Sequence, residues 1–204
     1  MKEITTEQTT DMILAACRAI IESKPYLTEV DSKIGDGDHG IGMAGGMEKA
    51  AAALREKRPF PDVNTVFKTT GMSMLNSMGG ASGVIFGSMF LGGVKGLSPI
   101  YTLDCSNFTR IFRGSLEAIK TRGKAAVGDK TMVDALEPAV IAMENAQQED
   151  LISLLNIAAN AVLKRTLKSA AIKEPVQAPV PGRGIPTKST SPQNPYFSIW
   201  SFLL

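Results

Sequence analysis

The sequence predicts an all-α protein of about seven to eight helices. Apolar residues recur at three- and four-residue spacing along most of residues 1–172, which is the period of an amphipathic helix. No stretch keeps the alternation of apolar and polar residues that marks a strand, and capping residues or prolines separate the segments. A chain of 204 residues is long enough for one substantial core.

Three helices are expected in the first part of the chain. The first covers Thr5 to Ser23 and ends at Lys24-Pro25, because a residue before proline disfavours the helical conformation. Residues 43–57 are rich in helix formers and are closed off by Pro59 and Pro61. The third starts at the capping residue Asp62, and its inner side is expected to carry Val63, Val66, Phe67 and Thr70.

Four further helices complete the pattern. Residues 81–94 are apolar nearly all round, which predicts a central helix buried on most faces. Asp104 caps a helix that runs to about Lys120. Residues 131–146 form the next helix, with a kink expected at Pro138, and Asp150 caps a last long helix.

The C-terminal segment breaks this pattern. Residues 173–204 hold six of the eleven prolines, a density that no helix accommodates. Its last residues, YFSIWSFLL, are apolar and are expected to dock on the helical body, because an exposed patch of this kind promotes aggregation. The sequence therefore predicts a helical domain at 1–172 and a proline-rich tail at 173–204.

Composition excludes several classes of protein. The charges balance within residues 1–172, which argues against a general nucleic-acid binder. No run of about twenty apolar residues offers a membrane span, and the first residues lack the pattern of a secretory signal. Cys17 and Cys105 are too few for a zinc site or a disulfide framework. We expect a cytoplasmic protein that binds neither nucleic acid nor membranes.

Three carboxylates occur within eight residues of one another, at Asp31, Asp36 and Asp38, interleaved with glycines just before a helix. Magnesium prefers carboxylate oxygens and keeps positions open for phosphate oxygens. Glycines let the backbone turn back, so that all three side chains can face one ion. The alternative is a polar turn in which one aspartate caps the helix. One aspartate would be enough for that role, so the pattern favours a metal site.

Two more loops have the composition of anion-binding sites. Residues 79–83 (GGASG) lead into a helix whose first N–H groups would face an anion, although a tight turn between packed helices explains them equally well. Residues 122–132 nearly match a P-loop, but Asp129 interrupts the motif and a helix precedes it. The single histidine, His39, directly follows Asp38, which favours a role near phosphates.

Together these residues resemble the nucleotide-binding L subunit of dihydroxyacetone kinase. The matching stretches are YLTEVDSKIGDGDHGIGM at 26–43, TTGMSMLNSMGGASGVIFG at 69–87 and RGKAAVGDKTMVDALEP at 122–138, in the family's order and spacing. The similarity covers about residues 8–165. It implies an up-and-down antiparallel barrel of eight helices, with a nucleotide and two magnesium ions at one end.

The resemblance also implies the site residues. Asp31, Asp36 and Asp38 would be the metal ligands, and no residue of this chain would act by covalent chemistry. The tail departs from the family, because only Gly182-Arg183 and Gln193-Asn194-Pro195 match its closing segment. The expected nucleotide contacts are His39, Gly40, Ile41, Gly42, Ala81, Ser82, Gly123 and Met132, with Arg183 in the tail.

By resemblance, the chain would be the Mg²⁺-ADP- or Mg²⁺-ATP-binding subunit of a kinase for dihydroxyacetone or a related small ketose. The ketose would sit on a partner K subunit. Some members of the family keep ADP and are recharged by a phosphotransferase-system protein, whereas others exchange ATP, and a homodimer is also compatible with the family. Two other functions stay open: a non-catalytic nucleotide-binding, regulatory or scaffold protein, and a metal-dependent phosphohydrolase.

Overall fold

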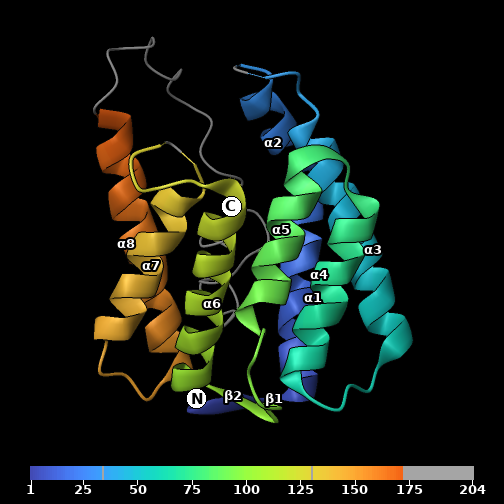
Figure 1. Cartoon of the computed structure of the whole chain (residues 1–204), viewed down its shortest axis with the longest axis vertical. Coiled ribbons are helices and arrows are strands. Elements are labelled where there is room, and N and C mark those ends of the chain that lie inside the picture. Colours follow the sequence, from blue (N-terminus) through green and yellow to red (C-terminus); the bar gives the residue numbers. More distant parts are fainter. Residues whose placement is uncertain (34, 130, 172–204) are drawn as a thin grey trace.

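The computed structural model describes residues 1–33, 35–129 and 131–171 and confirms the all-α prediction. These residues form eight helices and two short strands (Figure 1). The strands are β1 (Glu3–Thr5) and β2 (Thr102–Asp104). The helices are α1 (Thr6–Glu22), α2 (Lys24–Asp31), α3 (His39–Lys57), α4 (Val63–Ser77), α5 (Gly80–Gly93), α6 (Cys105–Gly123), α7 (Val133–Asn145) and α8 (Leu151–Ala171).

The long helices run alternately up and down, and each packs on its neighbour in sequence from α3 to α8 (Figure 1). Helix α1 packs against α3, and the short α2 lies across the top of this pair. Because direction alternates, the α2–α3, α4–α5 and α6–α7 connections all lie at the upper end in Figure 1. The α3–α4, α5–α6 and α7–α8 connections lie at the lower end.

A two-stranded ribbon joins distant parts of the chain at the lower end. Strands β1 and β2 pair antiparallel, with Ile4 opposite Leu103. The backbone carbonyl of Met1 also accepts a hydrogen bond of 2.9 Å from the Leu151 N–H at the start of α8. The sequence analysis missed both strands, because three residues are too few to show alternation.

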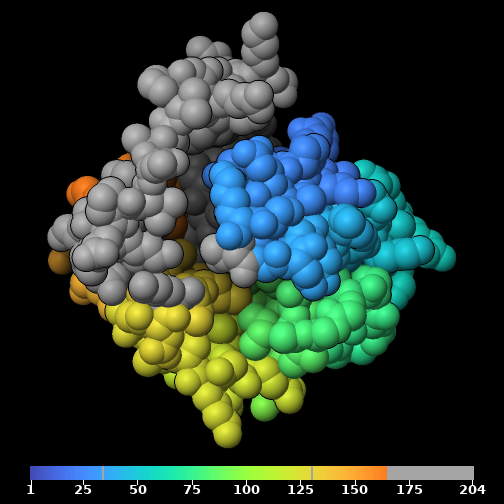
Figure 2. Space-filling model, turned by 90° about the horizontal axis from the view of Figure 1, so that it is seen from above, coloured from blue at the N-terminus to red at the C-terminus, as the bar shows by residue number. Residues whose placement is uncertain are grey.

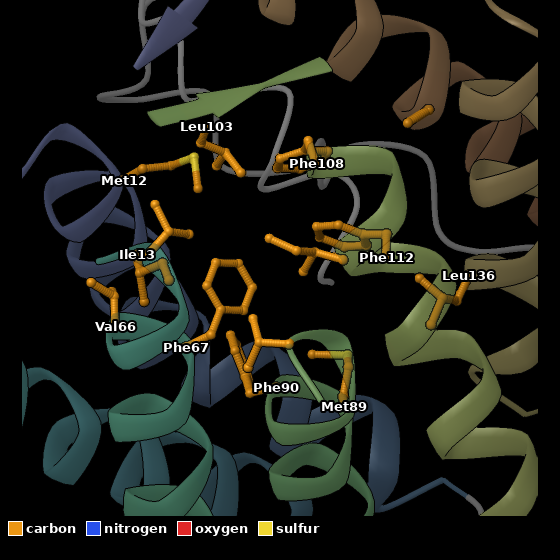
Figure 3. Packing of buried hydrophobic residues seen from close by; sticks show 14 of the residues in the cluster. Met12, Ile13, Val66, Phe67, Met89, Phe90, Leu103, Phe108, Phe112 and Leu136 are labelled. Carbon is orange, nitrogen blue, oxygen red and sulfur yellow. The ribbon is translucent and has the colours of Figure 1, made fainter. Parts of the chain in front are cut away.

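The apolar sides of the helices meet between them (Figure 3). The rings of Phe67 in α4 and Phe90 in α5 lie with centroids 5.9 Å apart, and those of Phe108 and Phe112 in α6 stack at 4.5 Å. Met12 of α1 faces the same interior. Residues that are distant in sequence therefore share one core, which holds the ends of the helices in place.

Helix α5 differs from its prediction. We expected it to be buried on most faces, but only Gly83, Gly87, Met89, Phe90 and Gly93 are buried. Its glycines let α4 and α6 approach its two sides closely. A Cβ atom at Gly87 would lie 2.9 Å from Leu75 Cβ, and one at Gly93 would lie 2.6 Å from Ser115 Oγ. Helix α5 thus packs between α4 and α6, and most of its remaining residues are half-buried.

The expected ends of the helices are mostly confirmed. The carboxylate of Asp62 accepts a bond from the Thr65 N–H at 2.7 Å, and that of Asp104 accepts from Asn107 at 2.7 Å. Asp150 caps α8 in the same way, accepting from the Ser153 N–H at 2.8 Å. Pro138 lies inside α7. No described helix is both long and apolar enough to cross a membrane.

Two boundaries differ from those expected. The first helix does stop before Pro25, but a new helix, α2, starts at once with this proline in its first turn. Proline is tolerated there because the N–H it lacks has no partner within the helix. Helix α3 begins at His39, four residues before the predicted start at 43. The tail at 173–204, including Arg183, lies outside the described residues.

Candidate functional site

The three motifs of the sequence analysis meet at the upper end of the molecule. The loop that follows α2, the turn before α5 and the segment 124–132 before α7 lie side by side there (Figures 1 and 2). In Figure 2, which looks down on this end, they are blue, green and yellow. The up-and-down arrangement thus brings together segments that are about 90 residues apart.

The structure brings the three predicted aspartates together. Asp31 is the last residue of α2, whereas Asp36 and Asp38 lie in the loop before α3. One carboxylate oxygen from each lies within 4.8 Å of the others. Asp36 and Asp38 are exposed and Asp31 is half-buried, so the group opens to solvent.

Hydrogen bonds within the loop produce this grouping. The N–H of Gly35 donates to the Asp31 carbonyl at 2.6 Å, and the N–H of Asp38 donates to Asp36 Oδ1 at 3.3 Å. Gly37 has a φ of 78°, in the left-handed region that glycine adopts without strain. Asp31 Oδ2 accepts from the His39 N–H at 3.3 Å, so this carboxylate faces the start of α3.

The capping alternative therefore explains one aspartate of the three. The Asp31 carboxylate accepts a hydrogen bond from the His39 N–H at the start of α3, as that alternative requires. Asp38, at the N-cap position itself, makes no side-chain capping bond. Capping of α3 therefore does not explain why Asp36 and Asp38 lie beside Asp31.

The electrostatics of the group favour a cation. The charge of Asp36 is the main cause that raises the pKa of Asp38, with smaller contributions from burial, a hydrogen bond to Asp36 and the charge of Asp31. No lysine or arginine in the described part of the chain forms an ion pair with any of the three. Three clustered carboxylates match the oxygen ligands that Mg²⁺ prefers, so the residues present fit this ion.

The candidate nucleotide-binding residues also lie at the upper end. The ring of His39 lies 6.4 Å, centroid to centroid, from that of Phe86, which links the start of α3 to the middle of α5. Gly123 ends α6, and a Cβ atom there would lie 3.4 Å from Ile85 Cδ1 in α5. His39, Gly40, Ile41 and Gly42 form the first turn of α3, Ala81 and Ser82 lie in the first turn of α5, and Met132 directly precedes α7.

These residues differ in their access to solvent. Ile41 is 57% exposed and Ala81 is exposed, whereas Ser82 and Met132 are half-buried. Gly40 is the exception, because it is buried against α2. It has less surface available to a ligand than its neighbours have.

Two aspartates order the loop before α7, a role that the sequence analysis missed. Asp129 accepts from the Ala126 N–H at 2.8 Å. Asp134 accepts from the Gly128 N–H at 2.8 Å and from the Thr131 N–H at 3.3 Å. The residue that interrupts the P-loop motif thus holds the loop in shape. The sequence did contain a signal for this role, because aspartate side chains often accept hydrogen bonds from backbone N–H groups of nearby turn residues.

Fold and site together define an all-α protein with an acidic candidate metal centre at one end of its helices. Residues 33–177 match the DAK2 domain, which is more than half of the chain. The chain therefore belongs to the DAK2 domain family, as the sequence motifs predicted.

Curated proteins similar to this chain include subunits of dihydroxyacetone kinases. The ADP-binding subunit DhaL of a PTS-dependent dihydroxyacetone kinase from Lactococcus lactis is 50% identical over 115 residues, covering 56% of this chain and 57% of that subunit. The DhaL subunit of PEP-dependent dihydroxyacetone kinase 1 from Listeria innocua is 45% identical over 130 residues, covering 64% and 63%. The matched region spans less than two thirds of these relatives.

Solved structures show the same fold. The native dihydroxyacetone kinase of C. freundii superposes with a TM-score of 0.65 at 26% identity, over 82% of this chain and 30% of that one. The same enzyme in complex with AMP-PNP and Mg²⁺ superposes with a TM-score of 0.64, over 79% and 29%. The helices described above thus correspond to part of a larger kinase chain.

Proposed function

We propose that the chain is the nucleotide-binding subunit of a cytoplasmic kinase that phosphorylates dihydroxyacetone or a related small ketose. The observation that carries this proposal is the grouping of three carboxylates at the end where the three glycine-rich segments meet. Membership of the DAK2 family and the ADP-binding function in the relatives' names support it. So does the complex of the C. freundii kinase with AMP-PNP and Mg²⁺.

Asp31, Asp36 and Asp38 would hold magnesium, two ions by resemblance to the family. Bound there, magnesium would neutralise phosphate charge and orient the terminal phosphoryl group. The first turns of α3 and α5 would donate backbone N–H groups to phosphate oxygens, because these groups have no partner within their helices. The residues of this chain would thus act by binding and orientation.

The remaining parts of the reaction would come from partners. The ketose would be held by a K subunit, and phosphoryl groups would come from exchanging ATP or from a phosphotransferase-system protein acting on bound ADP. These partners follow from the family resemblance, as does the homodimer, which stays a prediction.

Replacing Asp36 by alanine tests the metal site. We expect Asp36→Ala to abolish Mg²⁺-dependent ADP binding in calorimetry while the helical circular dichroism stays unchanged, because the remaining carboxylates would repel phosphates. Glu56→Ala is the matched control, because it also removes an exposed carboxylate. Glu56 lies near the C-terminal end of α3, at the opposite end of this helix from the three aspartates. Normal ADP binding by Asp36→Ala would refute the metal assignment, and loss of helicity would favour the capping role.

A second experiment separates the kinase from its two alternatives. The chain is mixed with ATP, Mg²⁺ and dihydroxyacetone, with and without a K subunit. Phosphoryl transfer only in the presence of K supports the kinase. Hydrolysis of ATP by the chain alone supports a phosphohydrolase, and binding without turnover supports a regulatory or scaffold protein.

A further inference from the structure

The contact between α2 and α3 is unusually close at one residue, Gly40. A Cβ atom built there would lie 2.7 Å from the Thr28 backbone N and closer still to the Lys24 carbonyl oxygen and Thr28 Oγ1. Two of these three atoms belong to the backbone of α2, and a backbone cannot turn aside as the end of a side chain can. Any side chain at position 40 would therefore push α2 as a unit away from α3.

A displacement of α2 would reach the carboxylate group directly. Asp31 is the last residue of this eight-residue helix, whereas Asp36 and Asp38 belong to the loop that enters α3. The bond from the His39 N–H to Asp31 Oδ2 joins the two elements beside Gly40. The distance between α2 and α3 thus sets where Asp31 lies relative to the other two carboxylates.

We propose that Gly40 is a positioning residue, whose missing side chain lets α2 pack against α3 and so places Asp31 in the metal-binding group. This inference rests on the proposed metal site. It differs from the role expected by resemblance, in which Gly40 contacts the nucleotide. Its burial against α2 fits positioning better than ligand contact.

The test uses Mn²⁺ alone, without nucleotide, measured by electron paramagnetic resonance. Mn²⁺ takes the same oxygen ligands as Mg²⁺. We expect Gly40→Ala to weaken Mn²⁺ binding about 10- to 100-fold, the usual effect of disturbing groups that orient metal ligands. Gly45→Ala is the control in the same helix, because a Cβ atom there would have no neighbour within 4 Å. It should leave Mn²⁺ affinity unchanged.

Hydrogen exchange supplies a readout of the helix itself. Amides of residues 24–32 should exchange faster in Gly40→Ala than in wild type or Gly45→Ala. If Gly40→Ala fails to fold, Thr28→Leu is the substitute variant. It enlarges the α2 side chain that faces Gly40, and a flexible leucine side chain can adjust more easily than the backbone. It should then weaken Mn²⁺ binding in the same direction.

The outcomes separate the inference from the function on which it rests. A wild-type chain that does not bind Mn²⁺ would refute the proposed metal site. Equal Mn²⁺ affinity in wild type and Gly40→Ala would overturn the positioning role alone. Unchanged Mn²⁺ binding with lost ADP binding would also overturn it, and would assign Gly40 to nucleotide contact.

Discussion

Asn64 is a buried polar residue whose removal should cost measurable stability. It lies in the first turn of α4 and is only 3% exposed. Its Nδ2 donates to the carbonyls of Leu97 and Ser98, both at 3.2 Å, and its Oδ1 accepts from the Ile100 N–H at 3.0 Å. One side chain thus binds three backbone groups of the segment that leads from α5 to β2.

The magnitude follows from these three bonds. A hydrogen bond within a protein contributes about 1 kcal/mol net, so Asn64→Ala should lower the free energy of unfolding by about 3 kcal/mol. For a chain of this size, 1 kcal/mol corresponds to about 2–4 °C in Tm, so the expected decrease is about 6–12 °C. In Asn64→Ala the Ile100 N–H would be buried without a partner, so we expect a decrease in Tm toward the upper end of this range.

Urea denaturation followed by circular dichroism at 222 nm measures this effect. Asn76→Ala is the matched control, because Asn76 lies in the same helix and is exposed. An exposed substitution of this kind should change stability by less than about 0.5 kcal/mol. If the two variants have the same midpoint, the hydrogen bonds of Asn64 do not stabilise the fold and the reasoning is wrong.

Two further predictions concern titratable groups. Burial raises the pKa of the Cys17 thiol to about 12, so mass spectrometry should find Cys17 unmodified by iodoacetamide at pH 8 until denaturant is added, and rapid labelling of the folded chain would contradict this. Arg113 donates to Glu144 from Nε at 2.7 Å and lowers the pKa of that carboxyl below its ordinary value of 4.5. The pair should therefore stabilise the fold by about 0.2–1 kcal/mol above pH 4.5 and lose this contribution as the pH falls through the lower folded pKa. The Tm difference between wild type and Glu144→Gln should shrink in acid, and a constant difference would argue against the pair.

Helix caps and the order of the motifs could be predicted from the sequence. Asp62, Asp104 and Asp150 are capping residues before apolar stripes, and each accepts the bond expected of it. The spacing of the three aspartates before a helix likewise pointed to a group of carboxylates, because glycines between them allow the chain to turn back.

Other features depend on contacts between elements and could not be predicted in this way. Helix α2 has a proline in its first turn and no fully buried residue, so it shows no apolar stripe. The burial of Gly40 depends on α2 and was missed with it. The close approach of α4 to Gly87 and of α6 to Gly93 depends on tertiary packing, which hydrophobic periodicity does not report.

The ribbon at the lower end has a consequence for biosynthesis. Ile4 is 1% exposed in the folded chain, but its strand partner Leu103 is made ~100 residues later. At translation rates of about 5–20 residues per second, that delay is roughly 5–20 s. Throughout this interval the nascent chain presents an apolar side chain with no partner strand, while α3 and α4 can already pair behind it. Residues 3–5 thus leave the ribosome well before the strand with which they pair.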